Sequence, residues 1–167
     1  FGIPFTLSTM SINSIEQVAE ATTKPFWFQL YVMRDRAFIE RLIDRAKAAK
    51  CSVLVLTMDL QILGQRHKDV RNGLRAPPPM TPAFVFELAT KPAWALGMLN
   101  AKSKTFGNIH GHVSDAIDLA SLSKWTASQF DLTLNWKDIG WIKDRFGGPV
   151  VVKGVLDPED AQLAVDN

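Results

Sequence analysis

The sequence predicts an α/β fold in which parallel strands alternate with covering helices. Short apolar segments alternate along the chain with longer segments in which apolar residues recur every three or four positions. Each apolar segment ends in polar residues, so polar side chains would gather at one edge of the sheet. The predicted order of elements is β-α-β-α-β, a long insertion, and then α-β-α.

The first two β-α units are compact. Phe5–Ser8 is the first predicted strand, and Ser14 has Gln17 three residues later, which is the spacing of a helix-capping box. Phe26–Tyr31 is the second predicted strand, which is aromatic and expected to be buried, and Asp35 is positioned to cap the helix after it. Both units therefore fall within the first 50 residues.

The third predicted strand, Val53–Asp59, begins with four consecutive apolar residues, a pattern typical of a strand buried on both faces. Thr57 and Asp59 lie at its carboxyl end, and their side chains share one side because the strand period is two residues. Arg66 follows seven residues later. A hydroxyl, a carboxylate and a guanidinium are thus expected near one strand end. A simpler alternative is that these polar groups only face solvent there.

A long insertion, about residues 74–130, separates the third unit from the fourth. Thr81 and Pro82 are typical of a helix start within it, and a second apolar stretch, Trp94–Leu99, follows. An insertion of this length exceeds a plain connection and usually has a function.

The fourth unit follows the insertion. Asn135 begins a predicted helix that stops at Gly147, and Val150–Gly154 is a fourth strand, expected to be buried, with Lys153 at its carboxyl end. Asp157 starts a final helix. Every strand supplies polar residues at its carboxyl end, and no Gly-rich dinucleotide fingerprint occurs. We therefore predict part of a (β/α)8 TIM barrel, with about four β-α units, rather than a doubly wound sheet.

Composition excludes several classes of function. The formal net charge of +2 argues against a nucleic-acid partner, and no apolar run reaches the length of a membrane-spanning helix. The single cysteine, Cys51, excludes an internal disulfide and is expected in the core. His110 and His112 give only a weak metal signal, so no metal site is predicted. The chain begins at Phe1 and ends near a helix, so we expect it to be a fragment of a longer protein.

The polar residues at the strand ends indicate specific chemistry. Lys153 is predicted to be a cation with little competing water, which would stabilise negative charge on a ligand or form a Schiff base as in an aldolase-like barrel. Gln29 and Thr57 offer donors and acceptors that suit the edge of a flat heterocycle. Tyr31 and Arg66 suit a carboxylate.

Several segments resemble the FMN-dependent L-2-hydroxy acid dehydrogenase/oxidase family. They are Phe28–Tyr31, Leu56–Asp59 with Gly64–Arg66, and Val152–Gly154 with Asp157–Ala161. The resemblance covers nearly the whole chain and is closest to the bacterial L-lactate dehydrogenases. It implies a TIM barrel, FMN as cofactor and a small L-2-hydroxy acid, foremost L-lactate, as substrate.

The resemblance also implies which residues bind the flavin. Ser8, Gln29, Thr57 and Lys153 would contact FMN, with Lys153 near the N1–C2=O edge, where a cation stabilises the reduced, anionic ring. The FMN phosphate site is expected outside residues 1–167.

Substrate contacts and catalytic roles follow from the same resemblance. Tyr31 and Arg66 would hold the substrate carboxylate and hydroxyl, and Met10 would face the substrate side chain. Asp59 would orient a catalytic histidine that is also expected outside this chain. Asp59, Tyr31 and Lys153 are thus the predicted catalytic residues, and the chain by itself is predicted to be inactive.

The resemblance gives the insertion a function. Some bacterial members dock to the membrane through an extended loop here and pass electrons to a quinone, while an apolar flap over the site is the alternative. We expect a cytoplasmic homo-oligomer, peripheral on the cytoplasmic face of the inner membrane. Oxygen as acceptor, mandelate or another 2-hydroxy acid as substrate, and a non-catalytic membrane-binding module stay open.

Overall fold

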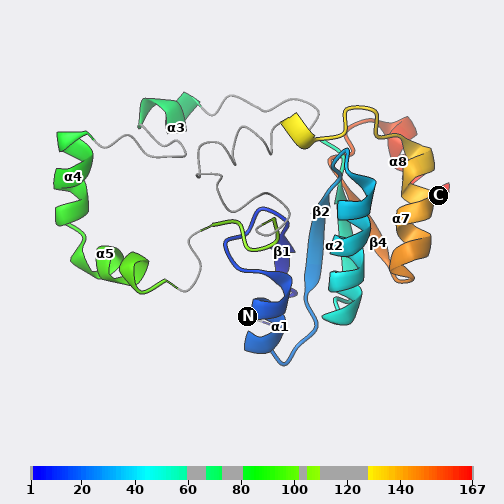
Figure 1. Ribbon diagram of the computed structural model, residues 1–167. Helices are drawn as coiled ribbons and strands as arrows, with labels where there is room; N and C mark the ends of the chain where they lie inside the picture. The colour runs from blue at the N-terminus through cyan, green and yellow to red at the C-terminus, as the bar shows by residue number, and fades with distance from the viewer. Residues whose placement is uncertain (1, 60–66, 73–80, 102–104, 110–127, 167) are drawn as a thin grey trace.

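The computed structural model describes residues 2–59, 67–72, 81–101, 105–109 and 128–166 (Figure 1). Its four strands form one parallel sheet in the order β1-β2-β3-β4. The strands are β1 (Thr6–Ser8), β2 (Trp27–Tyr31), β3 (Val53–Thr57) and β4 (Val150–Lys153). The helices are α1 (Ile15–Ala21), α2 (Arg36–Ala48), α3 (His67–Arg71), α4 (Pro82–Ala89), α5 (Pro92–Leu99), α7 (Trp136–Phe146) and α8 (Pro158–Asp166).

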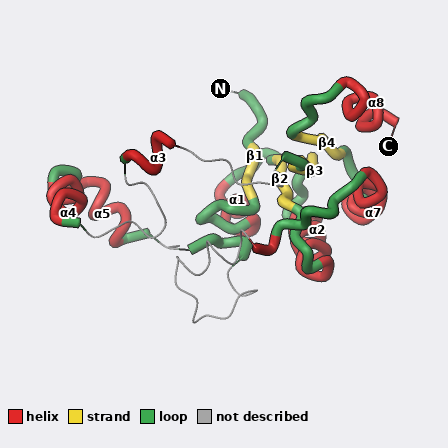
Figure 2. The backbone as a smooth tube through the Cα atoms, turned by 90° about the horizontal axis from the view of Figure 1, so that it is seen from above, coloured by secondary structure: helices red, strands yellow, loops and turns green. Residues whose placement is uncertain are grey.

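Helices α1, α2 and α7 lie on one side of the sheet (Figure 2). The core fills the space between them, and Phe28 and Leu54 from the sheet meet Ile39, Leu42 and Ile142 from the helices there. A doubly wound sheet reverses its strand order and carries helices on both faces. Sequential parallel strands with these helices on one face are instead the arrangement of a TIM barrel, as the sequence predicted.

We call the opposite side of the sheet, which carries Gln29, Tyr31, Thr57 and Lys153, the inner face. The second, third and fourth strands were expected to be buried; on β2 alternate side chains are buried, and on β4 Val151 is 42% exposed. Within the described residues, β4 pairs with β3 alone. In addition, the helices that pack on the sheet all lie on its other face. Within the described residues, none of them covers the inner face.

Side-chain caps are present at the helix starts that the sequence predicted. Ser14 and Asn135 form capping boxes with Gln17 and Asp138. The remaining caps are Asp35, Thr81 and Asp157. The short helix α3 was not predicted, because its five residues are too few to show an apolar period.

The insertion has two distinct described parts. Helices α4 and α5 contact each other and lie apart from the sheet in both views (Figures 1 and 2). Residues 105–109 instead return to the sheet, where the Gly107 amide donates to the Ser11 carbonyl at 3.0 Å. Farther on, Phe130 bridges to Met33 before the chain enters α7. The described helices include none that is both long and apolar enough to cross a membrane.

Candidate active site

Polar side chains from adjacent strands meet at the carboxyl end of the inner face. The register places Tyr31 opposite Thr57 and Thr57 opposite Lys153. The Gln29 side-chain Nε2 donates to Thr57 Oγ1 at 2.7 Å, and Thr57 is buried. Ser8 lies opposite Gln29 at the end of β1. The structure therefore brings the four predicted flavin contacts together on neighbouring strands.

Asp59 and Lys153 form an ion pair at the ends of β3 and β4. Lys153 Nζ lies 3.1 Å from Asp59 Oδ2, and the two side chains are 39% and 51% exposed, the lysine more than the aspartate. Lys153 was expected to meet little competing water; in the described sheet β4 pairs with β3 alone, and the lysine is half exposed there. Asp59 was expected beside a histidine outside the chain and Lys153 beside a flavin, and their contact with each other was not predicted.

Gly154 makes the close approach of Asp59 possible. Its φ is +96°, and a Cβ at this position would lie 2.6 Å from Asp59 Cβ and 2.7 Å from Asp59 Cγ. Only a glycine combines this backbone conformation with so short a contact. Gly154 thus determines where the Asp59 carboxylate lies.

The predicted substrate contacts are only partly described. Tyr31 is half-buried, and its ring meets Phe130 edge to face at a centroid distance of 5.9 Å. A void of about 20 Å³ beside this pair has room for a single water. Met10 is half-buried in the loop after β1, and its amide donates to Ser8 Oγ at 3.2 Å. Arg66 lies outside the described residues.

Thr9 is a residue at this edge whose contacts were not predicted. It is fully buried, and its Oγ1 donates to the Gln29 carbonyl at 2.7 Å and accepts from the Tyr31 amide at 3.3 Å. Its hydroxyl therefore links the end of β1 to the backbone on both sides of Leu30. The polar run Ser8–Ser11 directly after an apolar strand was the only sequence signal for it.

Asn108, in the return segment of the insertion, is a second residue that was missed. It is 1% exposed, and its Nδ2 donates to the carbonyls of Ser8 and Thr9 at 3.3 and 3.4 Å. No local sequence signal points to this residue, because the contact joins positions about 100 residues apart.

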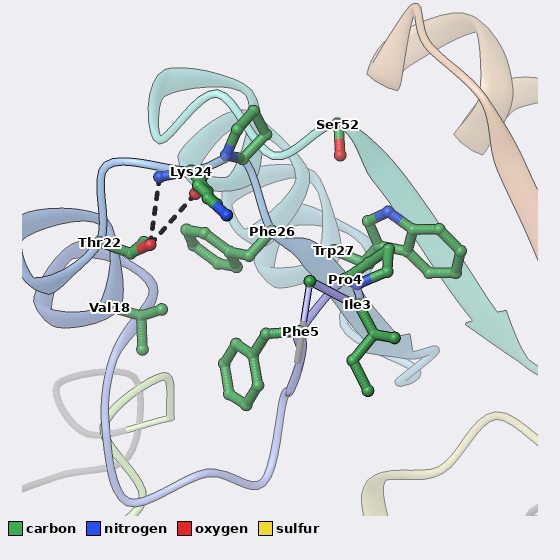
Figure 3. Close-up of a pocket in the computed structure, with 11 residues that line it drawn as sticks. Ile3, Pro4, Phe5, Val18, Thr22, Lys24, Phe26, Trp27 and Ser52 are labelled. Carbon is green, nitrogen blue, oxygen red and sulfur yellow. Dashed lines mark hydrogen bonds between the residues drawn. The ribbon is translucent and has the colours of Figure 1, made fainter.

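A larger cavity opens at the other end of the sheet, where β2 and β3 begin (Figure 3). Its volume is about 560 Å³, and apolar side chains, including Phe5, Phe26 and Trp27, contribute most of its lining. Of its polar residues, Thr22 and Lys24 hydrogen-bond to each other. Because the ligands of barrel enzymes bind at the carboxyl ends of the strands, we assign the candidate site to the Gln29–Thr57 edge.

The donor set at this edge suits a flat, hydrogen-bonding heterocycle. An amide on Gln29 and hydroxyls on Thr57 and Ser8 supply donors and acceptors, and the Lys153 ammonium is the neighbouring positive charge. No cluster of histidine, cysteine and acidic residues that could hold a metal occurs within the described ranges. His110 and His112 lie outside those ranges.

Comparison with known proteins agrees with this chemistry. A family model described as FMN-dependent dehydrogenase matches residues 1–167. The crystal structure of a monotopic membrane protein, (S)-mandelate dehydrogenase, is 30% identical, covers 99% of this chain and 43% of its own, and superposes with a TM-score of 0.87. For a mandelate oxidase the identity is 29%, the coverage 99% and 38%, and the TM-score 0.66.

A protein from Pediococcus acidilactici assigned as a lactate oxidase is 28% identical, with coverage of 96% and 35% and a TM-score of 0.64. The chain thus spans less than half the length of each of these three proteins. The family match covers every residue of the sequence, and the donor set of the inner face fits a flavin. The chain therefore belongs to the family of FMN-dependent dehydrogenases that act on 2-hydroxy acids, and FMN is its cofactor.

Proposed function

We propose that the full-length protein oxidises an L-2-hydroxy acid, foremost L-lactate to pyruvate, and passes the electrons to a respiratory acceptor. The observation that carries this proposal is the Gln29–Thr57 pair beside Lys153 and Asp59 at the carboxyl ends of adjacent strands. When bound, FMN supplies the two-electron acceptor for the substrate. The similarity to proteins named for lactate and mandelate supports the substrate class.

Four residues of this chain would hold the flavin. Gln29 and Thr57 already orient each other through their hydrogen bond, so their remaining donor and acceptor atoms are preorganised for a ring edge. Ser8 lies beside them in register. Lys153 would place its positive charge where negative charge develops, a role that family membership favours over a Schiff base.

Three further residues would act on the substrate. Tyr31 and Arg66 would bind its carboxylate and hydroxyl, and Met10 would contact its side chain. Asp59 would orient and stabilise a protonated histidine contributed from outside residues 1–167. This assignment makes the chain alone inactive and the full-length protein active.

Anaerobic flavin reduction in the full-length protein tests the proposal. We expect L-lactate to bleach the flavin absorbance faster than (S)-mandelate, and Lys153→Met to slow bleaching at least about tenfold, which corresponds to about 1.4 kcal/mol. Lys137→Met, at an exposed lysine on α7, is the matched control and should react as the wild type does. Failure of every 2-hydroxy acid to reduce the flavin would refute the proposal.

The electron acceptor separates a dehydrogenase from an oxidase. With lactate in air, stoichiometric peroxide would identify oxygen as the acceptor, as in the alternative oxidase function. Reduction of a soluble quinone analogue with little peroxide is the expected result.

A membrane surface is the second proposed partner, and α4 with α5 carries it. Large apolar side chains are exposed on both helices: Val85, Phe86, Trp94, Leu96, Met98 and Leu99, at 41–74%. Each helix has eight residues, so it extends about 12 Å and lies in an interface rather than crossing the core of a bilayer. The monotopic membrane protein among the similar structures supports this function over a flap.

Charge makes the membrane proposal specific. Glu87 and Lys91, the only charged residues of this hairpin, pair at 2.7 Å, so anionic lipid adds little attraction. We expect flotation with neutral phosphatidylcholine vesicles that persists in high salt. Phe86→Ser with Leu96→Ser should abolish flotation, whereas Leu132→Ser, at an exposed leucine outside the hairpin, should not. Flotation of the double variant would leave the flap as the better explanation.

A further inference from the structure

The return segment of the insertion packs tightly on the loop after β1. Gly107 lies so close to this loop that a Cβ would be 2.6 Å from both the Ile12 carbonyl oxygen and the Ser14 nitrogen. Its amide donates to the Ser11 carbonyl at 3.0 Å. The contact is therefore backbone against backbone, and it fixes the distance between the two segments.

Asn108 is the centre of this contact. Besides its two bonds to the carbonyls of Ser8 and Thr9, its Oδ1 accepts from the Ile15 amide at 2.9 Å. Arg45 Nη2 reaches the same Oδ1 at 3.4 Å, and Arg45 Nη1 donates to the Asn108 carbonyl at 3.1 Å. One buried residue thus joins the end of β1, the start of α1 and the last turn of α2.

The two functions of this amide are separable. Its oxygen serves the start of α1 and Arg45, which is a structural function. Its nitrogen holds the carbonyls of Ser8 and Thr9, the two residues that lead to Met10. A rotation of these peptide groups would shift Ser8 relative to the flavin and Met10 relative to the substrate.

We propose that Asn108 is a positioning residue, which from within the insertion fixes the Ser8–Met10 backbone for flavin and substrate. For Met10 this inference rests on the proposed function, and for Ser8 it rests on the FMN site. The insertion then has a second function besides the α4–α5 hairpin, because its return segment completes the active-site loop.

The test uses the full-length protein and two variants. Asn108→Ala removes both functions, whereas Asn108→Asp keeps an acceptor for the Ile15 amide and Arg45 but loses the donor to the two carbonyls. We measure the FMN dissociation constant and the ratio of kcat/KM for L-lactate over (S)-mandelate. Both variants should weaken FMN binding about tenfold and change the ratio at least threefold.

A purely structural function predicts a different result, in which Asn108→Asp behaves as the wild type. Ile142→Val, a core substitution on α7, controls for lost stability and should leave both quantities unchanged. Asn13→Ala, at an exposed asparagine of the loop after β1, is a second control. If Asn108→Ala or Asn108→Asp does not accumulate as folded protein, Asn108→Ser, which also lacks the amide donor, is measured in its place. FMN affinity and substrate ratio within twofold of the wild type in the Asn108 variants would overturn the proposal.

FMN affinity also separates this inference from the proposed function. If no 2-hydroxy acid reduces the flavin of the wild type while the Asn108 variants bind FMN more weakly, the proposed reaction fails and the positioning of the flavin loop stands.

Discussion

Replacing Gly154 with alanine should misplace Asp59 without changing any polar group. The new Cβ would meet Asp59 Cβ at 2.6 Å, well inside the usual carbon–carbon separation of about 3.5–4.0 Å. Asp59 must therefore retreat by about 1 Å. The Asp59 nitrogen, which would lie 3.1 Å from the new Cβ, adds to the crowding. This retreat would separate Asp59 from Lys153, which are 3.1 Å apart in the structure.

The cost has two parts. Holding alanine at a φ of +96° costs about 1–3 kcal/mol. Loss of the exposed Lys153–Asp59 pair adds at most about 1 kcal/mol. Gly154→Ala should therefore lower the free energy of unfolding by about 1–4 kcal/mol.

Urea unfolding of the full-length protein measures this loss, and anaerobic reduction of its flavin by L-lactate measures the effect on the site. We expect a lower urea midpoint and slower flavin reduction at saturating FMN. Gly140→Ala is the matched control, because a Cβ at that position would have no neighbouring atom within 4 Å and alanine favours the helix by about 1 kcal/mol. A Gly154→Ala protein as stable and as fast as the wild type would refute the reasoning.

Three further predictions concern the supporting structure. Thr9→Val leaves the Tyr31 amide without its acceptor and should cost about 1–3 kcal/mol in urea unfolding, whereas Thr6→Val, at an exposed residue of β1, should cost little. A hydrogen bond from Arg45 lowers the pKa of Glu16 to about 2, so this pair stabilises the fold above pH 4.5 and the stabilisation is lost as the pH falls toward 2. The advantage of the wild type over Glu16→Gln in urea midpoint should therefore shrink over that range, and a constant difference would contradict the assignment. Burial raises the pKa of the Cys51 thiol to about 11, so a disulfide reagent at pH 8 should modify Cys51 only once urea unfolds the protein.

Local chemistry explains why the elements of this fold were predictable. Helix caps such as Ser14 and Asn135 act within three residues, and the strand pattern around Leu54 repeats over a few positions. The burial of β4 was not predictable in the same way, because Val150–Val152 is apolar in sequence while its exposure depends on which strands pair with it. The apolar pattern correctly identified β4 as a strand, but it could not show which strands lie beside it.

The candidate site divides along the same line. Thr57 and Lys153 were predictable because they end strands, and Gln29 because it lies two residues before the end of β2; parallel strands bring their carboxyl ends to one edge. Thr9 and Asn108 were not, because their function lies in hydrogen bonds to backbone atoms of distant segments. Asparagine and threonine in loops are too common for sequence alone to distinguish such residues from solvated ones.

The pairing of Asp59 with Lys153 is consistent with separate roles for the two residues during the proposed reaction. Both side chains are more than one third exposed, and ion pairs of this kind contribute only about 0–1 kcal/mol. A protonated histidine held against Asp59, or negative charge developing beside Lys153 in a site closed to water, interacts more strongly than the exposed pair does. The pair therefore holds both groups near the strand ends, and the interactions proposed for the reaction are stronger than the pair.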